Sequence, residues 1–322
     1  MKRIIIFTIL LIIILGACFL AFHKKEGDVP VIRLISTDSI HTAPFHVMKE
    51  LKLIEKYAPD VKVEYAIGDG GTAVDEAIIA DKADIGVTSI TNFAIGFNKG
   101  IPYKIASAIG YARTGLQTNN PNIKSLKDIG PDDRIAVASP TGGATIYLKM
   151  ACEKEFGNLN ALEDNLIVMD TYAAQLALIN KSSGISLHMD SLATILYENR
   201  EGCPTILDDV AVMGGKYASV VTVAANDFVE KNPDLYNAYL LALEEATALI
   251  NNKDEQALEI VFEYCKIKKE DIVAYLDSGN LFYTTTDFSV LPFTDFLYKT
   301  GQIPTKIESL QDISFPNVTA KK

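Results

Sequence analysis

Apolar strand-like runs alternate with amphipathic helix-like segments over most of this chain, and this alternation limits the possible fold more than any other feature. Residues 31–35, 61–66, 83–89 and 103–109 have the pattern of strands, and helical periodicity fills most of the intervals between them. Strands that are joined through helices can run parallel in one sheet. We therefore expect an α/β fold with mostly parallel sheets, whose ligands gather at the carboxyl ends of the strands.

The same alternation continues in a second block of the chain. Residues 134–138, 166–169 and 187–189 are further predicted strands, and glycine-containing segments at 110–115 and 212–216 flank the block. We interpret these two segments as crossovers, and as hinges, between two Rossmann-like lobes. The predicted first lobe comprises residues 31–112 and 218–322, and the predicted second lobe comprises residues 113–217.

The N-terminus has the pattern of a secretion signal. Lys2 and Arg3 precede an uncharged apolar run from Ile4 to Phe22. Within it, Leu15-Gly16-Ala17-Cys18 resembles the bacterial lipobox, so we expect cleavage before Cys18 and lipidation of this cysteine. The protein would then lie outside the cytoplasm, anchored by lipid at the cell surface or in the periplasm, with residues 1–17 as the signal peptide and 18–30 as a tether. An uncleaved membrane anchor is the alternative, because about 18 apolar residues approach the length that spans a bilayer.

The composition restricts the partners. The chain has 30 Lys and Arg against 41 Asp and Glu, so its formal net charge is −11. Loss of Lys2 and Arg3 with the signal peptide changes this to 28 minus 41, or −13. Such an acidic protein is a poor partner for nucleic acid or for anionic lipid headgroups. Cys152, Cys203 and Cys265 are isolated, so we expect buried free thiols, with one disulfide as the alternative.

One predicted strand–turn–helix segment, residues 134–151, has the features of a ligand-binding turn. Gly142 and Gly143 stand between the strand and the start of the helix. The first N–H groups of a helix have no intrahelical partner and carry partial positive charge from the helix dipole, so this turn suits an anionic or strongly polar group. The segment matches neither Gly-x-Gly-x-x-Gly nor a phosphate-binding loop. An ordinary capped turn is the alternative.

Short motifs occur in a characteristic order between residues 32 and 318. They are Ala83-Asp84-Ile85-Gly86, Gly100-Ile101-Pro102, Ser125-Leu126-Lys127-Asp128, Asp227 to Pro233, Lys299-Thr300-Gly301 and Phe315-Pro316-Asn317-Val318. This order resembles the solute-binding proteins of ABC importers, in the family that includes nitrate, sulfonate, taurine and thiamine-precursor receptors. The resemblance implies the type II periplasmic-binding-protein fold, whose two lobes close on a ligand. It also implies a monomer without cofactor, metal or catalytic activity, which passes a small molecule to an importer's permease and ATPase.

The implied ligand is a small polar organic molecule with an acidic or acceptor-rich end. We expect this end to lie at strand ends that run into helices, against Ser89, Thr91, Asn92, Ser139, Thr141, Gly142 and Gly143. We expect the other end to lie against Asp38, Ser39, His41, His188 and Asp190.

The segment from Ser186 to Ser191 departs from the family's pattern of a histidine, an aromatic residue and prolines, because Met189 and Asp190 intervene. The ligand therefore stays open between a sulfonate-, taurine- or nitrate-like anion and a thiamine-precursor pyrimidine. Asp190 either caps the next helix or faces the cleft, where it would recognise a cationic or donor-rich group.

Other chemistries fit the sequence less well. His41, His46 and His188, with Asp190, are zinc-ligand types, but the spacing of the first two matches no metal motif. Ser139 does not lie in Gly-x-Ser-x-Gly, and no acid or base is marked for it. The same fold occurs in a fungal pyrimidine-synthesising enzyme, whose Cys-rich segment is missing here. A binding protein is the leading interpretation, and an enzyme or ligand-sensing subunit of the same fold is the alternative.

Overall fold

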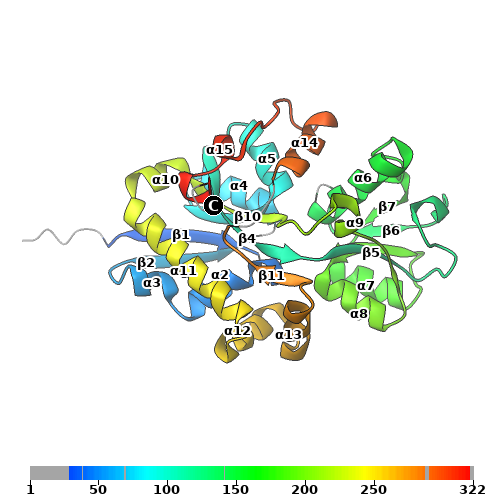
Figure 1. The fold of residues 1–322 in the computed structure, drawn as a ribbon, viewed down its shortest axis with the longest axis horizontal. Coiled ribbons are helices and arrows are strands. Elements are labelled where there is room, and N and C mark those ends of the chain that lie inside the picture. Colours follow the sequence, from blue (N-terminus) through cyan, green and yellow to red (C-terminus); the bar gives the residue numbers. More distant parts are fainter. Residues whose placement is uncertain (1–28, 38, 69, 141, 287–289, 320–322) are drawn as a thin grey trace, which may run out of the picture.

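Two β-sheets form the centres of two lobes in the computed structural model of this protein (Figure 1). The structure describes residues 29–319 except 38, 69, 141 and 287–289. The first lobe is built on a six-stranded sheet in the order β11-β4-β10-β3-β1-β2. Its strands are β1 (Val31–Ser36), β2 (Lys62–Ile67), β3 (Ile85–Ser89), β4 (Tyr103–Ala112), β10 (Val220–Ala225) and β11 (Leu281–Tyr283).

The second lobe is built on a five-stranded sheet in the order β7-β6-β8-β5-β9. Its strands are β5 (Thr114–Thr118), β6 (Ile135–Val137), β7 (Leu166–Val168), β8 (Leu187–Ser191) and β9 (Thr205–Asp208). The chain passes to this lobe at Arg113, between β4 and β5, and returns through residues 209–219, between β9 and β10. On this basis we propose lobe boundaries at residues 112/113 and 217/218.

In each sheet, the strand that follows a crossover runs antiparallel to its neighbours. β1 runs parallel to β2 and β3, and β6 runs parallel to β7 and β8. β5 is antiparallel to both of its neighbours, and so is β10. The predicted α/β fold with two crossovers is confirmed, and β5 and β10 are the strands that begin just after each crossover.

Helices cover the faces of both sheets (Figure 1). In the first lobe they are α2 (Ala43–Glu50), α3 (Leu53–Tyr57), α4 (Gly70–Ile79), α5 (Ile90–Asn98), α10 (Asn226–Lys231), α11 (Pro233–Asn251), α12 (Glu255–Cys265), α13 (Lys269–Asp277), α14 (Leu291–Lys299), α15 (Leu310–Ile313) and α16 (Pro316–Thr319). In the second lobe they are α6 (Gly143–Phe156), α7 (Thr171–Ile179), α8 (Leu192–Arg200) and α9 (Asp209–Met213). Short 3₁₀ turns lie at η1 (Ile40–Thr42), η2 (Leu126–Asp128) and η3 (Glu163–Asn165).

Several local predictions were wrong in detail. The apolar pattern predicts one helix over residues 45–56, whereas the structure ends α2 at Glu50 and begins α3 at Leu53. Lys52 between them has a φ of 50°, in the left-handed region that a continuous helix cannot contain. The sequence also predicts Asn232 as the cap of a helix whose first residue is Pro233. Pro233 does begin α11, but the Asn232 side chain donates to the carbonyl of Phe228 instead of capping the helix.

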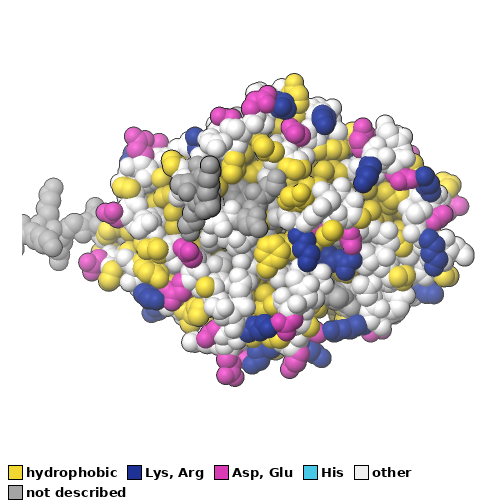
Figure 2. All heavy atoms as spheres, in the orientation of Figure 1, with side chains coloured by type: hydrophobic (Ala, Val, Ile, Leu, Met, Phe, Trp, Pro, Cys, Tyr) yellow, Lys and Arg dark blue, Asp and Glu magenta, His cyan; other side chains and the backbone are white. Residues whose placement is uncertain are grey.

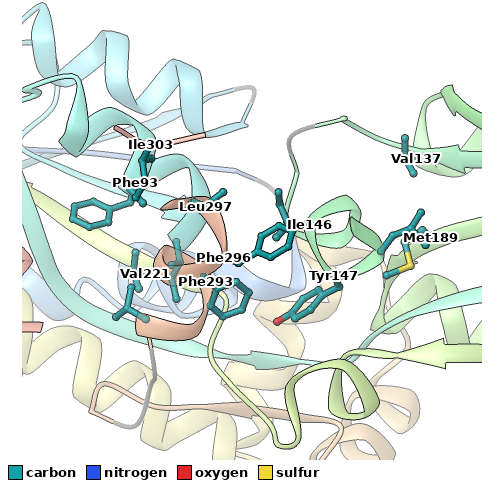
Figure 3. Packing of buried hydrophobic residues seen from close by; sticks show 14 of the residues in the cluster. Phe93, Val137, Ile146, Tyr147, Met189, Val221, Phe293, Phe296, Leu297 and Ile303 are labelled. Carbon is teal, nitrogen blue, oxygen red and sulfur yellow. The ribbon is translucent and has the colours of Figure 1, made fainter. Parts of the chain in front are cut away.

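The apolar core continues from one lobe to the other. One cluster contains Phe93 of α5, Tyr147 of α6 and Phe293 of α14, which are all at least 98% buried (Figure 3). The rings of Tyr147 and Phe293 meet edge to face, with centroids 5.5 Å apart and planes at 70°. Aromatic pairs prefer this geometry because the positive ring edge faces the negative ring surface. The two lobes therefore touch through a buried apolar contact on one side of the crossovers.

The surface mixes both signs of charge. Acidic and basic side chains are interspersed over the face drawn in Figure 2. Within the described part of the chain, no helix has both the length and the apolar character needed to cross a membrane. Cys152 and Cys203 are buried free cysteines, and Cys265 is partly exposed. Burial raises the pKa of the Cys152 thiol to about 11, so this thiol is unreactive at neutral pH.

Candidate ligand-binding site

A cavity of about 450 Å³ lies where the two lobes face each other. Its volume falls in the range of small-molecule sites, roughly 300–1,000 Å³. The walls come from the carboxyl ends of β1, β3 and β6 and from the first turns of α4, α5 and α6. The lining residues are Thr37, Ser39, His41, Thr42, Gly70, Gly71, Thr72, Val87, Thr88, Ser89, Asn92 and Val220 from the first lobe, and Ala138, Ser139, Gly142 and Gly143 from the second.

The second lobe contributes the start of α6. Gly142 is the N-cap residue of this helix and has no side chain to occupy the free N–H groups of the first turn. The carbonyl of Ser139 accepts a hydrogen bond from the Thr145 hydroxyl at 2.6 Å, which ties the turn to the first turn of α6. A Cβ on Gly143 would meet no atom within 4 Å, so the backbone here is open to a ligand. Thr141, also predicted for this site, lies outside the described residues.

The first lobe contributes a buried hydroxyl and the start of α4. Thr88 of β3 is only 3% exposed, and its Oγ1 has no hydrogen-bond partner among the described residues. Gly71 of α4 packs against it: a Cβ on Gly71 would lie 2.6 Å from Thr88 Oγ1 and 2.5 Å from Asn92 Nδ2. Only glycine allows this approach without displacing the two side chains. A buried unpaired hydroxyl is costly, so Thr88 is suited to donate to a bound ligand.

The start of α5 is partly satisfied from within the protein. Ser89 is its N-cap, and the Ser89 hydroxyl accepts from the backbone N–H of Asn92 at 3.1 Å. The hydroxyls of Ser89 and Thr91 lie 3.0 Å apart. Asn92 donates its side-chain amide to Asp75 at 3.3 Å. The structure thus brings Ser89 and Asn92 to the cavity, whereas Thr91 is 2% exposed and is not part of the lining.

The electrostatics of the lining favour an anionic or acceptor-rich group. Among the described lining residues there is no carboxylate and no Lys or Arg. Burial lowers the pKa of His41, against the opposing effect of the Asp190 carboxylate, so the imidazole is neutral at neutral pH. Partial positive charge therefore comes from the helix N-termini, each worth about 0.3–1 kcal/mol towards an anion and up to about 2 kcal/mol when partly buried. Asp38, predicted for the same region, lies outside the described residues.

The structure does not bring His188 to the cavity. His188 and Glu198 are both fully buried inside the second lobe, with His188 Nδ1 2.6 Å from Glu198 Oε1. Asp190 Oδ1 accepts from the N–H of Ser191 at 2.7 Å, and Oδ2 accepts from the Thr194 hydroxyl at 3.1 Å. Both bonds lie at the start of α8, so Asp190 supports the beginning of that helix, one of the two roles expected for it.

The three histidines considered for zinc do not meet. His41 lines the cavity, His46 stacks on Tyr264 at a ring-centroid distance of 4.0 Å, and His188 lies inside the second lobe. No group of three or more His, Cys, Asp and Glu side chains suited to a metal occurs in the described part of the chain.

Several lining residues were missed by reasoning from the sequence. The sequence pattern places Gly70 and Gly71 at a strand end where ligands gather, but the site prediction did not include Thr37, Thr42, Thr72 or Thr88. Thr88 had a signal, because it is a polar residue near the end of an otherwise apolar strand. Ser39, His41, Ser89, Asn92, Ser139, Gly142 and Gly143 were predicted and do line the cavity.

Comparison with known proteins shows the family to which the chain belongs. The family model described as NMT1/THI5 like matches residues 58–257. The chain belongs to this family. A comparison with curated proteins found no match.

Solved structures show the same fold. The periplasmic aliphatic sulphonate-binding protein SsuA from Escherichia coli superposes with a TM-score of 0.70 at 17% identity, over 88% of this chain and 92% of that one. The alkanesulfonate-binding protein SsuA from Xanthomonas axonopodis pv. citri, bound to MOPS, gives 0.70 at 11% identity, over 88% and 98%. The periplasmic nitrate-binding protein NrtA from Synechocystis gives 0.58 at 18% identity, over 77% and 70%. The predicted periplasmic-binding-protein fold is confirmed.

Proposed function

We propose that this family member is an extracytoplasmic solute-binding lipoprotein, which captures a small polar anion and delivers it to an ABC importer. The observation that carries the proposal is the cavity between the lobes, where three helix N-termini and the unpaired Thr88 hydroxyl converge. Groups that bind anions without a full cationic charge are concentrated there. The sulfonate and nitrate named for the structural neighbours are anions of this kind.

Ligand capture would proceed by hinge closure. The cavity takes its lining from both lobes, so a ligand that contacts Thr88 and Gly143 together bridges them. Such a ligand binds the closed arrangement better than an open one, and its binding energy shifts the equilibrium towards closure. The hinge segments are residues 110–115 and 212–216.

The permease and ATPase of an importer are the expected partners, and the protein would act as a monomer attached to the membrane by lipid at Cys18. Two acyl chains give stable attachment where one chain binds only marginally. Cells that express the Cys18→Ala variant should incorporate no palmitate analogue into this protein, in contrast to the parent. Equal labelling of both proteins would contradict lipidation at this residue.

The ligand class is tested by native mass spectrometry of the purified protein, followed by calorimetry with nitrate, MOPS and an aminopyrimidine. We expect one of the two anions to bind and to raise the melting temperature. At about 100 times its dissociation constant, a ligand adds about 2.7 kcal/mol to the free energy of unfolding.

The matched pair of variants is Thr88→Val and Thr222→Val. Both residues are buried threonines of adjacent strands, but Thr222 does not line the cavity and its hydroxyl lies 3.4 Å from the carbonyl of Ser107. Only the first substitution should weaken binding. Equal effects would place the site elsewhere, and chemical conversion of the bound compound would favour an enzyme of the same fold.

A further inference from the structure

An ion pair joins the two lobes away from the ligand cavity. Arg200, the last residue of α8 in the second lobe, donates both guanidinium NH groups to the two carboxylate oxygens of Asp271 in α13 of the first lobe. We propose that this pair is a latch, which holds the lobes together in the absence of ligand. The proposal rests on the hinge closure described above.

The geometry of this contact is typical of the stronger ion pairs between arginine and a carboxylate. The contact is two-pronged, with NH1 of Arg200 3.2 Å from Oδ2 of Asp271 and NH2 bonded to Oδ1. Planar guanidinium and carboxylate groups match in this arrangement, which fixes orientation as well as distance. The Asp271 side chain is only 20% exposed, against 56% for Arg200. The guanidinium lowers the pKa of Asp271, so the carboxylate stays charged at neutral pH.

Apolar packing closes only part of this side. Leu192, the first residue of α8, is buried in the apolar cluster of the first lobe, and a groove is left beyond it. A groove of about 500 Å³ lies between α7 and α8 on one wall and the α12–α13 segment on the other, and both members of the pair line it. Tyr197 and Tyr275 lie along the same groove. Because the two walls stand apart, the ion pair spans a gap. Its rupture would remove the polar contact across the groove and leave Leu192 of α8 as the apolar contact on this side.

The contact on the other side of the crossovers differs. There, Tyr147 of α6 and Phe293 of α14 meet inside the apolar cluster that the lobes share (Figure 3). In Figure 1, α6 and α14 lie above β4 and β5, whereas α8 and α13 lie below them. The lobes are thus joined on both sides of the crossovers, by a ring contact above and by the ion pair together with buried Leu192 below.

A latch of this kind changes ligand affinity without touching the ligand. The apparent affinity of a protein falls by the fraction of molecules that occupy the competent arrangement. An exposed ion pair shifts such an equilibrium by up to about fivefold. Charge reversal shifts it further, because it replaces attraction with repulsion between like charges.

The test uses small-angle X-ray scattering of the ligand-free protein, so it does not depend on the identity of the ligand. We expect the radius of gyration of the parent to match this structure, and we expect Arg200→Glu and Asp271→Arg each to increase it. The double variant R200E/D271R restores opposite charges across the gap and should return the radius to the parental value.

The matched control is Lys269→Glu. Lys269 of α13 pairs with Glu259 of α12 at 2.6 Å, inside the first lobe, so its reversal breaks an exposed ion pair without touching the lobe boundary. This variant should keep the parental radius. The latch is refuted if R200E and D271R leave the radius unchanged, if K269E expands the protein as much, or if the double variant stays as expanded as the single ones. If these results refute the latch while the protein still binds a ligand, the proposed function stands.

Discussion

Asp209 should make this protein more stable in mildly acidic solution than at neutral pH. The carboxyl group lies where both crossover segments meet: its Oδ1 accepts from the Tyr111 hydroxyl at 3.2 Å and from the N–H of Thr114 at 3.3 Å. The residue is 1% exposed. Burial raises the pKa of Asp209 from 3.8 to about 6, against the opposing effect of these two hydrogen bonds. Loss of hydration disfavours the charged form, and two donors at long distances do not compensate for it.

The sign follows from the proton affinity of each state. The folded protein holds the proton more tightly than the unfolded chain, so the stabilisation is complete below pH 3.8 and is lost as the pH rises through 6. A shift of about two pKa units corresponds to about 3 kcal/mol. Asp209→Asn removes the ionisation and keeps an oxygen that accepts from Tyr111 and Thr114. We expect this variant to raise the free energy of unfolding at pH 7.5 by up to about 3 kcal/mol.

Urea unfolding between pH 4 and 8 measures this effect. Far-ultraviolet circular dichroism is the appropriate signal, since the chain has no Trp. The parent should lose stability relative to Asp209→Asn as the pH rises from 4 to 6. The control is Asp208→Asn. It keeps an oxygen that can cap α9 but removes the charge that pairs with Arg113, so it should not raise stability at neutral pH. Parallel pH profiles of the parent and Asp209→Asn would refute the reasoning.

Two predictions concern the cavity. Thr88→Val should weaken anion binding by about 0.5–1.5 kcal/mol in calorimetry, the usual worth of one hydrogen bond, and should leave the melting temperature unchanged or slightly raised because an unpaired hydroxyl is removed. Gly71→Ala should lower both affinity and stability, because the new methyl group would overlap Thr88 Oγ1 and Asn92 Nδ2; unchanged values of both would show that α4 can move away at no cost.

The architecture follows from the sequence because it depends on periodicity. Alternating strands and helices, glycine-containing crossovers and the break before α6 are local patterns, and they mark most strands of both sheets. Residues 114–118, which form β5, were interpreted as part of the first crossover. β9 and β11 were not predicted. Each is at most four residues long and carries too little pattern to separate it from a loop, and each forms only because β5 or β4 offers a free edge. The left-handed Lys52 was equally hidden, because lysine is ordinarily a good helix former.

The site could be predicted where it depends on the ends of strands and the starts of helices. It could not be predicted where it depends on contacts between segments that are distant in the sequence. Ser89, Gly142 and Gly143 stand at strand–helix boundaries that the pattern marks. His188 and Asp190 are two residues apart on β8, so their side chains lie on the same face of the strand. The sequence does not reveal that Glu198 of α8 packs against this face and pairs with His188 inside the second lobe. Thr88 matters through its contact with Gly71, which joins segments about 17 residues apart and is invisible to any periodicity.

The cavity also predicts an unusual response to salt. A site that binds anions through a lysine or arginine loses affinity when salt screens the charge pair, whereas this cavity offers hydroxyls and helix N-termini within a protein of net charge −11. At long range the protein repels an anion, and this repulsion is screened beyond about 8–10 Å at physiological ionic strength. The short-range contacts lie inside the protein and are screened much less.

Affinity for the bound anion should therefore stay constant or rise as the salt concentration increases from about 10 mM to 150 mM, where the Debye length falls from about 30 Å to about 8 Å. Calorimetry at several concentrations measures this, with two salts of different anions to separate screening from competition for the cavity. A fall of tenfold or more that both salts share would mean that a cationic side chain carries the binding. Such a side chain would have to reach the cavity from outside its described lining, so that result would overturn the assignment of Thr88 and the helix starts as the principal anion-binding groups.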